Sequence, residues 1–180
     1  MTWYVARSSG LVAWALIAAS TLWGLALTTR AFSGRASPRW LLDLHRWLGG
    51  LSVVFVGVHL VTIAADTYVH FGWADVFVPF ASAWRPADVA WGVVALYLLV
   101  AVEVTSLARR RLPPRVWRTV HGLSFPLFVL TTVHILLAGT DTVDPWAQWP
   151  VIATTMVVAF LGVARAVAPN RETRADPRGT

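Results

Sequence analysis

Five long apolar stretches divide this sequence, and they constrain its fold more than any other feature. Each is close to the roughly 20 residues that a helix needs to cross a hydrocarbon core of about 30 Å. Backbone polar groups find no water in that core, so a spanning segment must satisfy them internally as a helix. The sequence therefore predicts an all-α integral membrane bundle of five transmembrane helices, and the spans are 11–29, 41–65, 89–108, 116–138 and 149–164.

The segments outside the spans are too short to form a second core. We therefore predict one membrane domain over residues 1–168, followed by a polar tail, 169–180, that is disordered and cytoplasmic. The connection 69–83 is apolar but too short to cross a membrane, and Gly72 and Pro79 interrupt it. Apolar segments of this kind lie in the membrane interface. We predict a short interfacial helix there, between the second and third spans.

The distribution of arginine predicts the orientation of the spans. All 15 basic residues are arginines, and 13 of them fall on one side of the predicted membrane. By the positive-inside rule that side is cytoplasmic, which places the N-terminus outside and the C-terminus inside. The membrane topology therefore accounts for the basic charge, and no nucleic-acid partner is needed to explain it. Arginine in place of lysine, with abundant alanine, is typical of a GC-rich bacterial genome, so we expect a multi-pass protein of a bacterial inner membrane.

Four of the five histidines fall in two of the spans at matched depths. In the second span His45 and His59 are 14 residues apart, and in the fourth span His121 and His134 are 13 apart. At 1.5 Å per residue these separations are about 21 and 20 Å along a helix axis. The second and fourth spans cross in the same direction. His45 therefore shares the inner level with His121, and His59 shares the outer level with His134.

Two imidazoles at each level predict the chemistry of the site. Ionisable side chains inside a membrane are costly and mark functional sites. With no nearby carboxylate or thiolate, two imidazoles do not complete a tetrahedral zinc site, but they fill both axial positions of a haem iron. The chain has no cysteine, which excludes iron–sulfur clusters and covalent c-type haem. We therefore predict two haem b groups, whose iron ligands are His45, His59, His121 and His134.

Other residues near the histidines fit a haem pocket. Glycines let a porphyrin approach a helix backbone, and those beside the histidines are Gly49, Gly50, Gly57 and Gly122. Three arginines near the inner pair are candidates to hold haem propionates, although topology alone would also place them there, and these are Arg46, Arg115 and Arg118.

The spacing in the fourth span does not suit a straight helix. Fourteen residues bring a side chain back to within about 40° of the same face, but thirteen leave it about 140° away. Pro126 lies between His121 and His134 and predicts a kink. We expect that distortion to help both imidazoles face the second span.

The segments LHRWLGGLSVVFVGVHL and VWRTVHGLSFPLFVLTTVHIL resemble the haem-bearing helices of the ferric reductase-like transmembrane domain. That superfamily includes NADPH oxidases, ferric reductases and the haem subunit of the bacterial methionine sulfoxide reductase system. The resemblance implies that His45 and His121 bind an inner haem, and that His59 and His134 bind an outer one. NADPH oxidases carry a long cytosolic flavin and NADPH domain after the last span, whereas this sequence shows no strand with a Gly-rich fingerprint to hold a dinucleotide.

These observations favour the membrane subunit of an oxidoreductase, with no FAD or NADPH site of its own. It would pass electrons from a cytoplasmic flavoprotein reductase through both haems to an unknown acceptor outside. Three different functions stay open: a quinone-linked cytochrome b-type anchor with a site near Glu103, a single-haem methionine sulfoxide reductase-like subunit, and a metal-ion transporter. His70 lies in the outer connection, and no haem ligation is expected of it.

Overall fold

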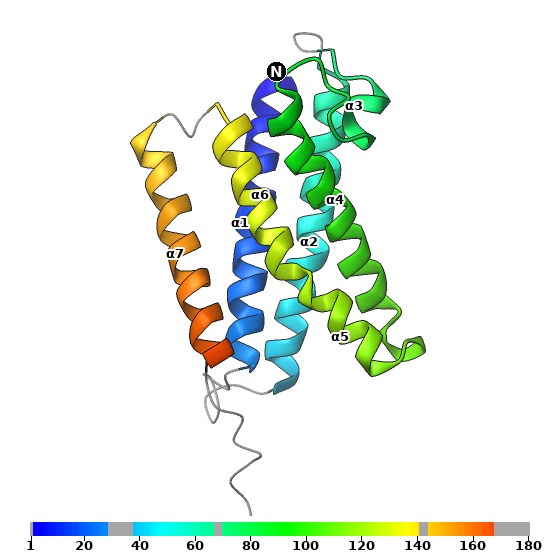
Figure 1. Ribbon diagram of the computed structural model, residues 1–180, viewed down its shortest axis with the longest axis vertical. Coiled ribbons are helices and arrows are strands. Elements are labelled where there is room, and N and C mark those ends of the chain that lie inside the picture. The colour runs from blue at the N-terminus through cyan, green and yellow to red at the C-terminus, as the bar shows by residue number, and fades with distance from the viewer. Residues whose placement is uncertain (1, 29–37, 67–69, 141–143, 168–180) are drawn as a thin grey trace, which may run out of the picture.

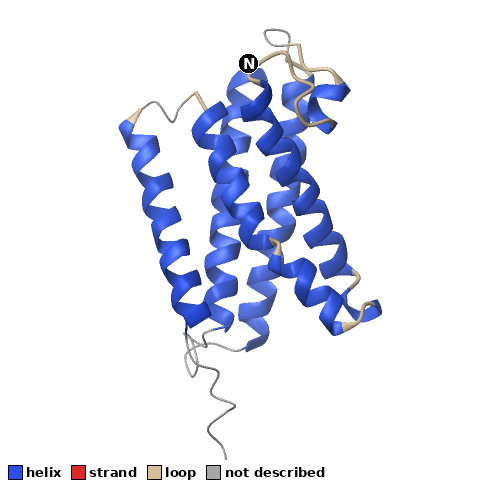
Figure 2. Cartoon of the chain, in the orientation of Figure 1, coloured by secondary structure: helices blue, strands red, loops and turns tan. Residues whose placement is uncertain are grey.

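The computed structural model describes residues 2–28, 38–66, 70–140 and 144–167, and in this part of the chain the regular structure is entirely helical (Figures 1 and 2). Five helices are long and apolar enough to cross a membrane, which confirms the predicted fold class. Four of these spans are α1 (Thr2–Thr28), α2 (Pro38–Ala64), α4 (Pro86–Leu107) and α7 (Pro145–Val167). The remaining span consists of α5 (Pro114–Gly122) and α6 (Ser124–Ala138).

The spans begin earlier than the apolar pattern predicts. The first begins at Thr2 rather than near residue 11, because a helix continues through polar residues whose hydroxyl groups bond to the preceding turn. Ser8 donates to the carbonyl of Tyr4, and Ser9 donates to that of Val5. The helices α2, α4, α5 and α7 each begin at a proline, which suits the first helical turn because its N–H groups have no partner within the helix.

The helices α1 and α6 lie at the centre of the bundle, with α7 on one side and α2 and α4 on the other (Figure 1). Buried residues from four helices form one core, and they include Trp14, Leu99, Phe128 and Val151. The indole N–H of Trp14 donates to the hydroxyl of Thr132 at 3.0 Å, which joins α1 to α6 inside this core. Polar bonds between helices are favourable in a membrane because the groups have few other partners.

The fourth span is broken at Leu123, between its two histidines. Pro126 has no N–H to donate to the carbonyl of Gly122, and its ring would crowd that carbonyl in a straight helix. The chain accordingly ends α5 at Gly122 and begins α6 at Ser124, and α5 turns away from the α6 axis in Figure 1. The predicted distortion is therefore present. Helix α6 buries three residues in the core, whereas α5 has no buried residue.

A short helix, α3 (Trp73–Phe77), lies between the second and third spans, as predicted. It sits at the end of the bundle where α1 and α4 begin (Figure 1). The Tyr97 hydroxyl donates to the carbonyl of Phe77 and fastens α3 to α4. Val76 is buried, while Trp73 and Phe80 are exposed. Exposed aromatic side chains at this level are typical of a membrane interface.

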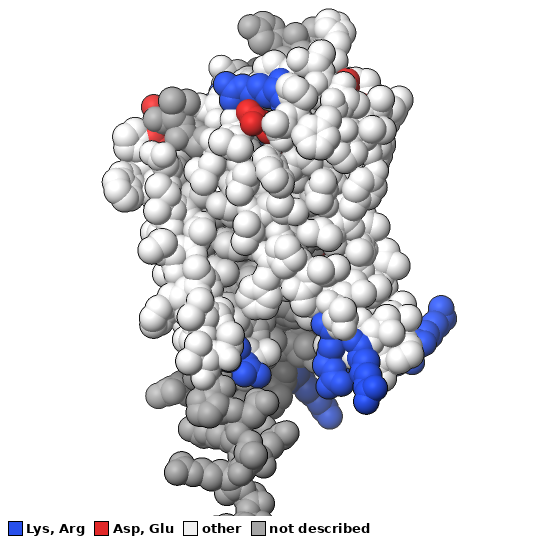
Figure 3. Space-filling model, in the orientation of Figure 1, with Lys and Arg blue, Asp and Glu red and all other residues white. Residues whose placement is uncertain are grey.

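Charged side chains lie at the two ends of the bundle and leave its middle uncharged on the face shown in Figure 3. Arginines alone gather at the end where α5 lies, and the opposite end shows arginine together with acidic residues. Several arginines that support the predicted orientation lie outside the described residues, as does the tail, 169–180. The boundary of the membrane domain and the state of that tail remain predictions.

Candidate functional site

The inner histidines meet although they come from helices far apart in the chain. His45 belongs to α2 and His121 to α5, and their ring centroids are 6.0 Å apart with an angle of 81° between the ring planes. A metal bonded at about 2 Å to one nitrogen of each ring would set the centroids roughly 6 Å apart. The separation of these two imidazoles therefore suits a single metal between them.

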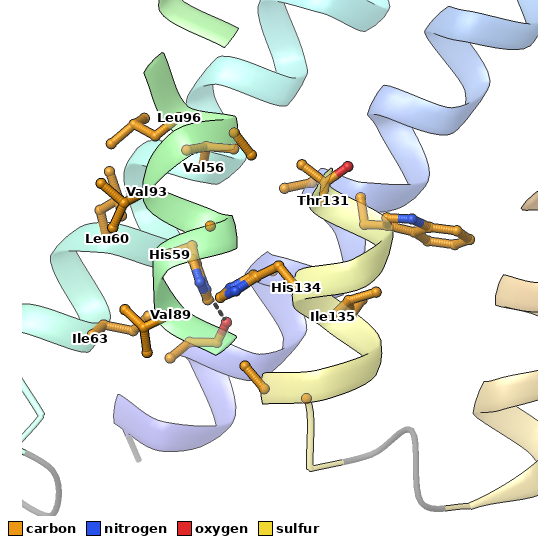
Figure 4. Close-up of a pocket in the computed structure, with 18 of the residues that line it drawn as sticks. Val56, His59, Leu60, Ile63, Val89, Val93, Leu96, Thr131, His134 and Ile135 are labelled. Carbon is orange, nitrogen blue, oxygen red and sulfur yellow. Dashed lines mark hydrogen bonds between the residues drawn. The ribbon is translucent and has the colours of Figure 1, made fainter. Parts of the chain in front are cut away.

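The outer histidines also face each other. The rings of His59, on α2, and His134, on α6, point toward one another in Figure 4. Both line a cavity of about 210 Å³ whose walls are mostly aliphatic and aromatic, and Leu60, Val93 and Ile135 are among them. A largely apolar cavity with two convergent nitrogen ligands is the kind of site that holds a flat, apolar macrocycle.

Each outer ring is fixed by a hydrogen bond from Nδ1 to a backbone carbonyl. His59 donates to the carbonyl of Ala6 on α1 at 2.7 Å, and this bond is drawn as a dashed line in Figure 4. His134 donates to the carbonyl of Asp88 on α4 at 2.8 Å. A carbonyl can only accept, so Nδ1 carries the hydrogen in both rings. The lone pair is then on Nε2, which is the arrangement of a metal-binding histidine.

The inner rings are held at the same nitrogen, but by serine hydroxyls. Nδ1 of His45 lies 3.3 Å from Oγ of Ser20 on α1, and Nδ1 of His121 lies 3.3 Å from Oγ of Ser106 on α4. A hydroxyl can accept or donate, so these bonds are compatible with a free Nε2 without enforcing it. All four imidazoles therefore have a partner at Nδ1, and none of the four Nε2 atoms is used by these bonds.

Glycines on the facing helices make room for three of the rings. A Cβ on Gly92 would lie 2.7 Å from Cε1 of His134, and one on Gly10 would lie 3.0 Å from Cε1 and Nδ1 of His59. At Gly24 the nearest ring atom is Cε1 of His45, at 3.4 Å. Each of these glycines lies one turn after the residue that anchors the same ring. The group that bonds Nδ1 and the glycine one turn later together position the imidazole ring, and we call this pair of residues its seat.

The glycines singled out in the sequence behave differently from one another. A Cβ on Gly50, Gly57 or Gly122 would meet no described atom outside its own helix backbone within 4 Å, so these positions leave open space beside the ligand helices. Gly49 instead faces Glu103 on α4, because a Cβ there would lie 2.7 Å from the carboxyl Oε1. Among the described residues no ion pair joins Glu103 to an arginine.

The arginines predicted to hold propionates lie on the surface near the inner pair. Arg46 forms an exposed salt bridge with Asp43 at 3.3 Å. Arg115 and Arg118 are both exposed on α5. No hydrogen bond joins these three arginines to the histidine rings in the described part of the chain, and their role remains a prediction. His70 is exposed and is not among the described residues that line the outer cavity.

An aromatic residue that the sequence did not single out lies directly against an inner ligand. The indole of Trp117 stacks on His121, with centroids 5.0 Å apart and an interplanar angle of 21°. The guanidinium of Arg109 lies 4.3 Å from the centroid of the same indole. Trp117 Nε1 is buried without a hydrogen-bond partner among the described residues. The three side chains connect the exposed arginine-rich end of the bundle to the inner pair.

The donor set favours a metal that brings its own equatorial ligands. In the described residues no cluster of three or more histidine, cysteine or acidic side chains could hold a bare ion. Two imidazoles per level are enough for a haem iron with both axial positions filled. The geometry of the four rings and the apolar outer cavity fit that group.

The sequence of this chain matches one protein family over more than half of its length. The family described as ferric reductase like transmembrane component matches residues 9–132, which include three of the four paired histidines. The chain is similar to the protein-methionine-sulfoxide reductase heme-binding subunit MsrQ of Rhodospirillum rubrum. The two are 27% identical over 154 residues, which cover 79% of this chain and 71% of the relative. No solved structure matches the chain.

Proposed function

Because the chain belongs to the ferric reductase like transmembrane component family, we propose that it carries electrons across a membrane through two bis-histidine b-type haems. His45 and His121 would hold the inner one, and His59 and His134 the outer one. Bound haem would supply one-electron carrier chemistry, and two imidazoles on one iron would leave no position there for a substrate. The protein itself is a multi-pass membrane protein.

One observation carries this proposal: four imidazoles, in two facing pairs, are each anchored through Nδ1. The anchors Ala6, Ser20, Asp88 and Ser106 come from α1 and α4, and the rings from the helices packed beside them. Histidines that bind a metal almost always donate their other ring N–H to such a partner. Four histidines that served only for packing would not all need a hydrogen-bond partner at the same ring nitrogen, Nδ1.

The distribution of charge supports electron entry at the inner pair. Described arginines at the α5 end include Arg109, Arg110 and Arg111 in the turn after α4, and Arg165 near the end of α7. Under the positive-inside rule this end is cytoplasmic. An acidic donor protein, such as a flavoprotein reductase, would meet this basic end first. From there the Arg109–Trp117–His121 stack leads to the inner ligand.

A second candidate for the acceptor comes from the similarity to MsrQ. In this version the electrons leave the outer pair for a partner enzyme that reduces protein methionine sulfoxide, rather than for ferric iron or oxygen. The proposed path of the electrons through the membrane is the same for either acceptor, because the residues that hold the rings do not depend on the acceptor. Mixing pre-reduced protein with such a reductase, with a ferric chelate or with oxygen distinguishes the acceptors by their rates of haem reoxidation.

A quinone-linked anchor and a metal-ion transporter receive less support from the site. The quinone-linked anchor would use Glu103, which lies against Gly49 one turn from His45 and does not line the cavity that contains the outer pair. A metal-ion transporter would need more than two protein ligands at each level, and no such cluster exists in the described part of the chain.

The decisive experiment is the ratio of haem to protein in the purified chain. We expect two haems per chain, six-coordinate and low-spin, by pyridine haemochrome assay and reduced-minus-oxidised spectra. His45→Ala and His121→Ala should each lose one haem and keep the other, and His59→Ala and His134→Ala should lose the opposite one. His70→Ala serves as the control and should keep both. A protein with one haem contradicts the two-haem proposal, and a colourless protein contradicts ligation altogether.

A further inference from the structure

The two histidine pairs are anchored in different ways. Carbonyl oxygens of Ala6 and Asp88 hold the outer rings at 2.7 and 2.8 Å. Serine hydroxyls contact both inner rings at a longer distance, 3.3 Å in each case, and the backbone of Ser20 also hydrogen-bonds to His45. The outer anchors belong to the backbone and are the same for any side chain at those positions. The hydroxyl contacts are made by side chains, so a single substitution removes the anchor of His121 and the hydroxyl part of the anchor of His45.

The orientation of these two serines is unusual for hydroxyl residues in this bundle. Such residues in membrane helices commonly donate to a carbonyl one turn earlier in the same helix. Thr21, next to Ser20, donates to the carbonyl of Ile17 at 2.8 Å, and Thr105, next to Ser106, donates to that of Ala101 at 2.7 Å. In the part of the chain that the structure describes, the hydroxyls of Ser20 and Ser106 make no such bond and contact the imidazoles instead.

We propose that Ser20 and Ser106 are positioning residues specific to the inner pair, and that they set the reduction potential at the inner level independently of the outer one. This inference rests on the proposed function, because it concerns rings that ligate iron. It follows from the matched geometry of the two serines. Ser20 on α1 contacts the ring of His45 on α2, and Ser106 on α4 contacts the ring of His121 on α5.

The direction of the effect follows from the role of the Nδ1 hydrogen. When Nε2 is a ligand, Nδ1 carries the hydrogen and the serine oxygen accepts it. Such a bond makes the imidazole a more basic ligand. A more basic imidazole ligand would favour ferric over ferrous iron, because the ferric state carries the higher charge. Loss of a serine hydroxyl should therefore raise the midpoint potential at the inner level.

Potentiometric titration of the purified full chain tests the proposal, with absorbance and electron paramagnetic resonance as readouts. In Ser20→Ala and Ser106→Ala we expect one midpoint to move upward and the other to stay in place, with the larger shift in Ser106→Ala, because the backbone of Ser20 still bonds His45. The one that moves should be the one missing from His45→Ala. The adjacent Thr21→Val and Thr105→Val are matched controls and should move neither midpoint. Ser20→Thr and Ser106→Thr keep a hydroxyl and should stay close to the unsubstituted protein.

Two outcomes would overturn the proposal: neither midpoint moves in the alanine variants, or both move by the same amount. A haem-free measurement separates this failure from failure of the proposed function. In apo-protein with ¹⁵N-labelled histidine, the Nδ1 resonances of His45 and His121 should respond to the serine substitutions. Those of His59 and His134 should not respond. Unchanged resonances show that the serines do not anchor the rings, whether or not the protein binds haem.

Discussion

Gly92 on α4 lies so close to His134 on α6 that a methyl group on its Cα would stand 2.7 Å from Cε1 of the ring. Real side-chain contacts of this kind do not occur, so the ring or the helix would have to move. The carbonyl of Asp88, one turn before Gly92, holds the same ring at Nδ1. Glycine here leaves the space in which the hydrogen-bonded imidazole lies.

Substitution of Gly92 by alanine should therefore displace His134 and weaken the outer site. Loss of a supporting contact around a metal ligand typically lowers affinity by about 10- to 100-fold, and we expect the occupancy of the outer haem to fall accordingly. Gly10→Ala should act in the same direction through His59. In α7, Gly162→Ala is the control, since its Cβ would make an ordinary contact of 3.7 Å with Phe125. The haem-to-protein ratio measures the effect in all three variants. An unchanged ratio in Gly92→Ala would show that glycine at this position is not needed to hold His134.

The break in the fourth span predicts an effect confined to the inner site. In Pro126→Ala the missing N–H is restored, and the span can straighten across Leu123. Because α6 is fixed in the core and α5 buries no residue, α5 should be the part that moves. Thirteen residues of straight helix would turn His121 about 140° from His134. We expect loss of the inner haem with the outer one retained. Pro150→Ala, inside α7, is the control, and equal loss of both haems would contradict this account.

The buried bond between Trp14 and Thr132 should contribute to stability. In Thr132→Val the shape is kept, but the indole N–H loses its acceptor inside the core. Leaving a buried donor unpaired costs about 1–3 kcal/mol in proteins, and polar contacts in membranes fall near the lower end. We expect a loss of about 1 kcal/mol in the free energy of unfolding in mixed detergent. Thr155→Val is the control, because its hydroxyl bonds within α7 to Val151. No difference between the two variants would show that the inter-helix bond adds nothing.

Orientation can be measured with single cysteines, since the chain has none of its own. Ala74 in α3 and Arg110 in the turn after α4 are both exposed. In intact cells a membrane-impermeant maleimide should label Ala74→Cys, and it should label Arg110→Cys only after the membrane is opened. The physical reason is the cost of moving the arginine-rich end across the membrane during insertion. The opposite labelling pattern would reverse the proposed direction of electron flow.

Docking of an acidic donor should depend on the arginines after α4. Changing Arg109, Arg110 and Arg111 to glutamine should slow haem reduction by a flavoprotein reductase by about 10-fold at low salt, since complementary charge chiefly raises the association rate. The difference should shrink as salt screens the charges. Arg165→Gln, on α7 at the same end, is the control for net charge. A rate that ignores both salt and these substitutions would exclude docking at this turn.

Much of the fold follows from the sequence, because apolar length alone predicts five spans in a membrane. The pairing of His45 with His121 also follows, since it depends only on spacing and on parallel crossing. The anchors do not. Ala6 and Asp88 act through backbone carbonyls, which carry no side-chain signal, and a single serine such as Ser20 looks like any other serine in a membrane helix.

The glycines that touch the rings are not the ones beside the histidines in the sequence. Gly10, Gly24 and Gly92 lie on the facing helices. A side chain projects away from its own helix axis and meets the neighbouring backbone, so the relevant small residue is far away in sequence. Only the packing of α1 on α2 and of α4 on α6 identifies it.

The order of anchors and ligands along the chain has a consequence for biosynthesis. Ala6 and Ser20 are made before His45 and His59, and the helix with Asp88 and Ser106 is made before His121 and His134. Each imidazole thus enters the bilayer beside a partner that is already in place. Every pair, however, takes one ring from each half of the chain. The fourth span, which brings His121 and His134, must be made before either pair is complete, so insertion of the proposed haems would come late in synthesis.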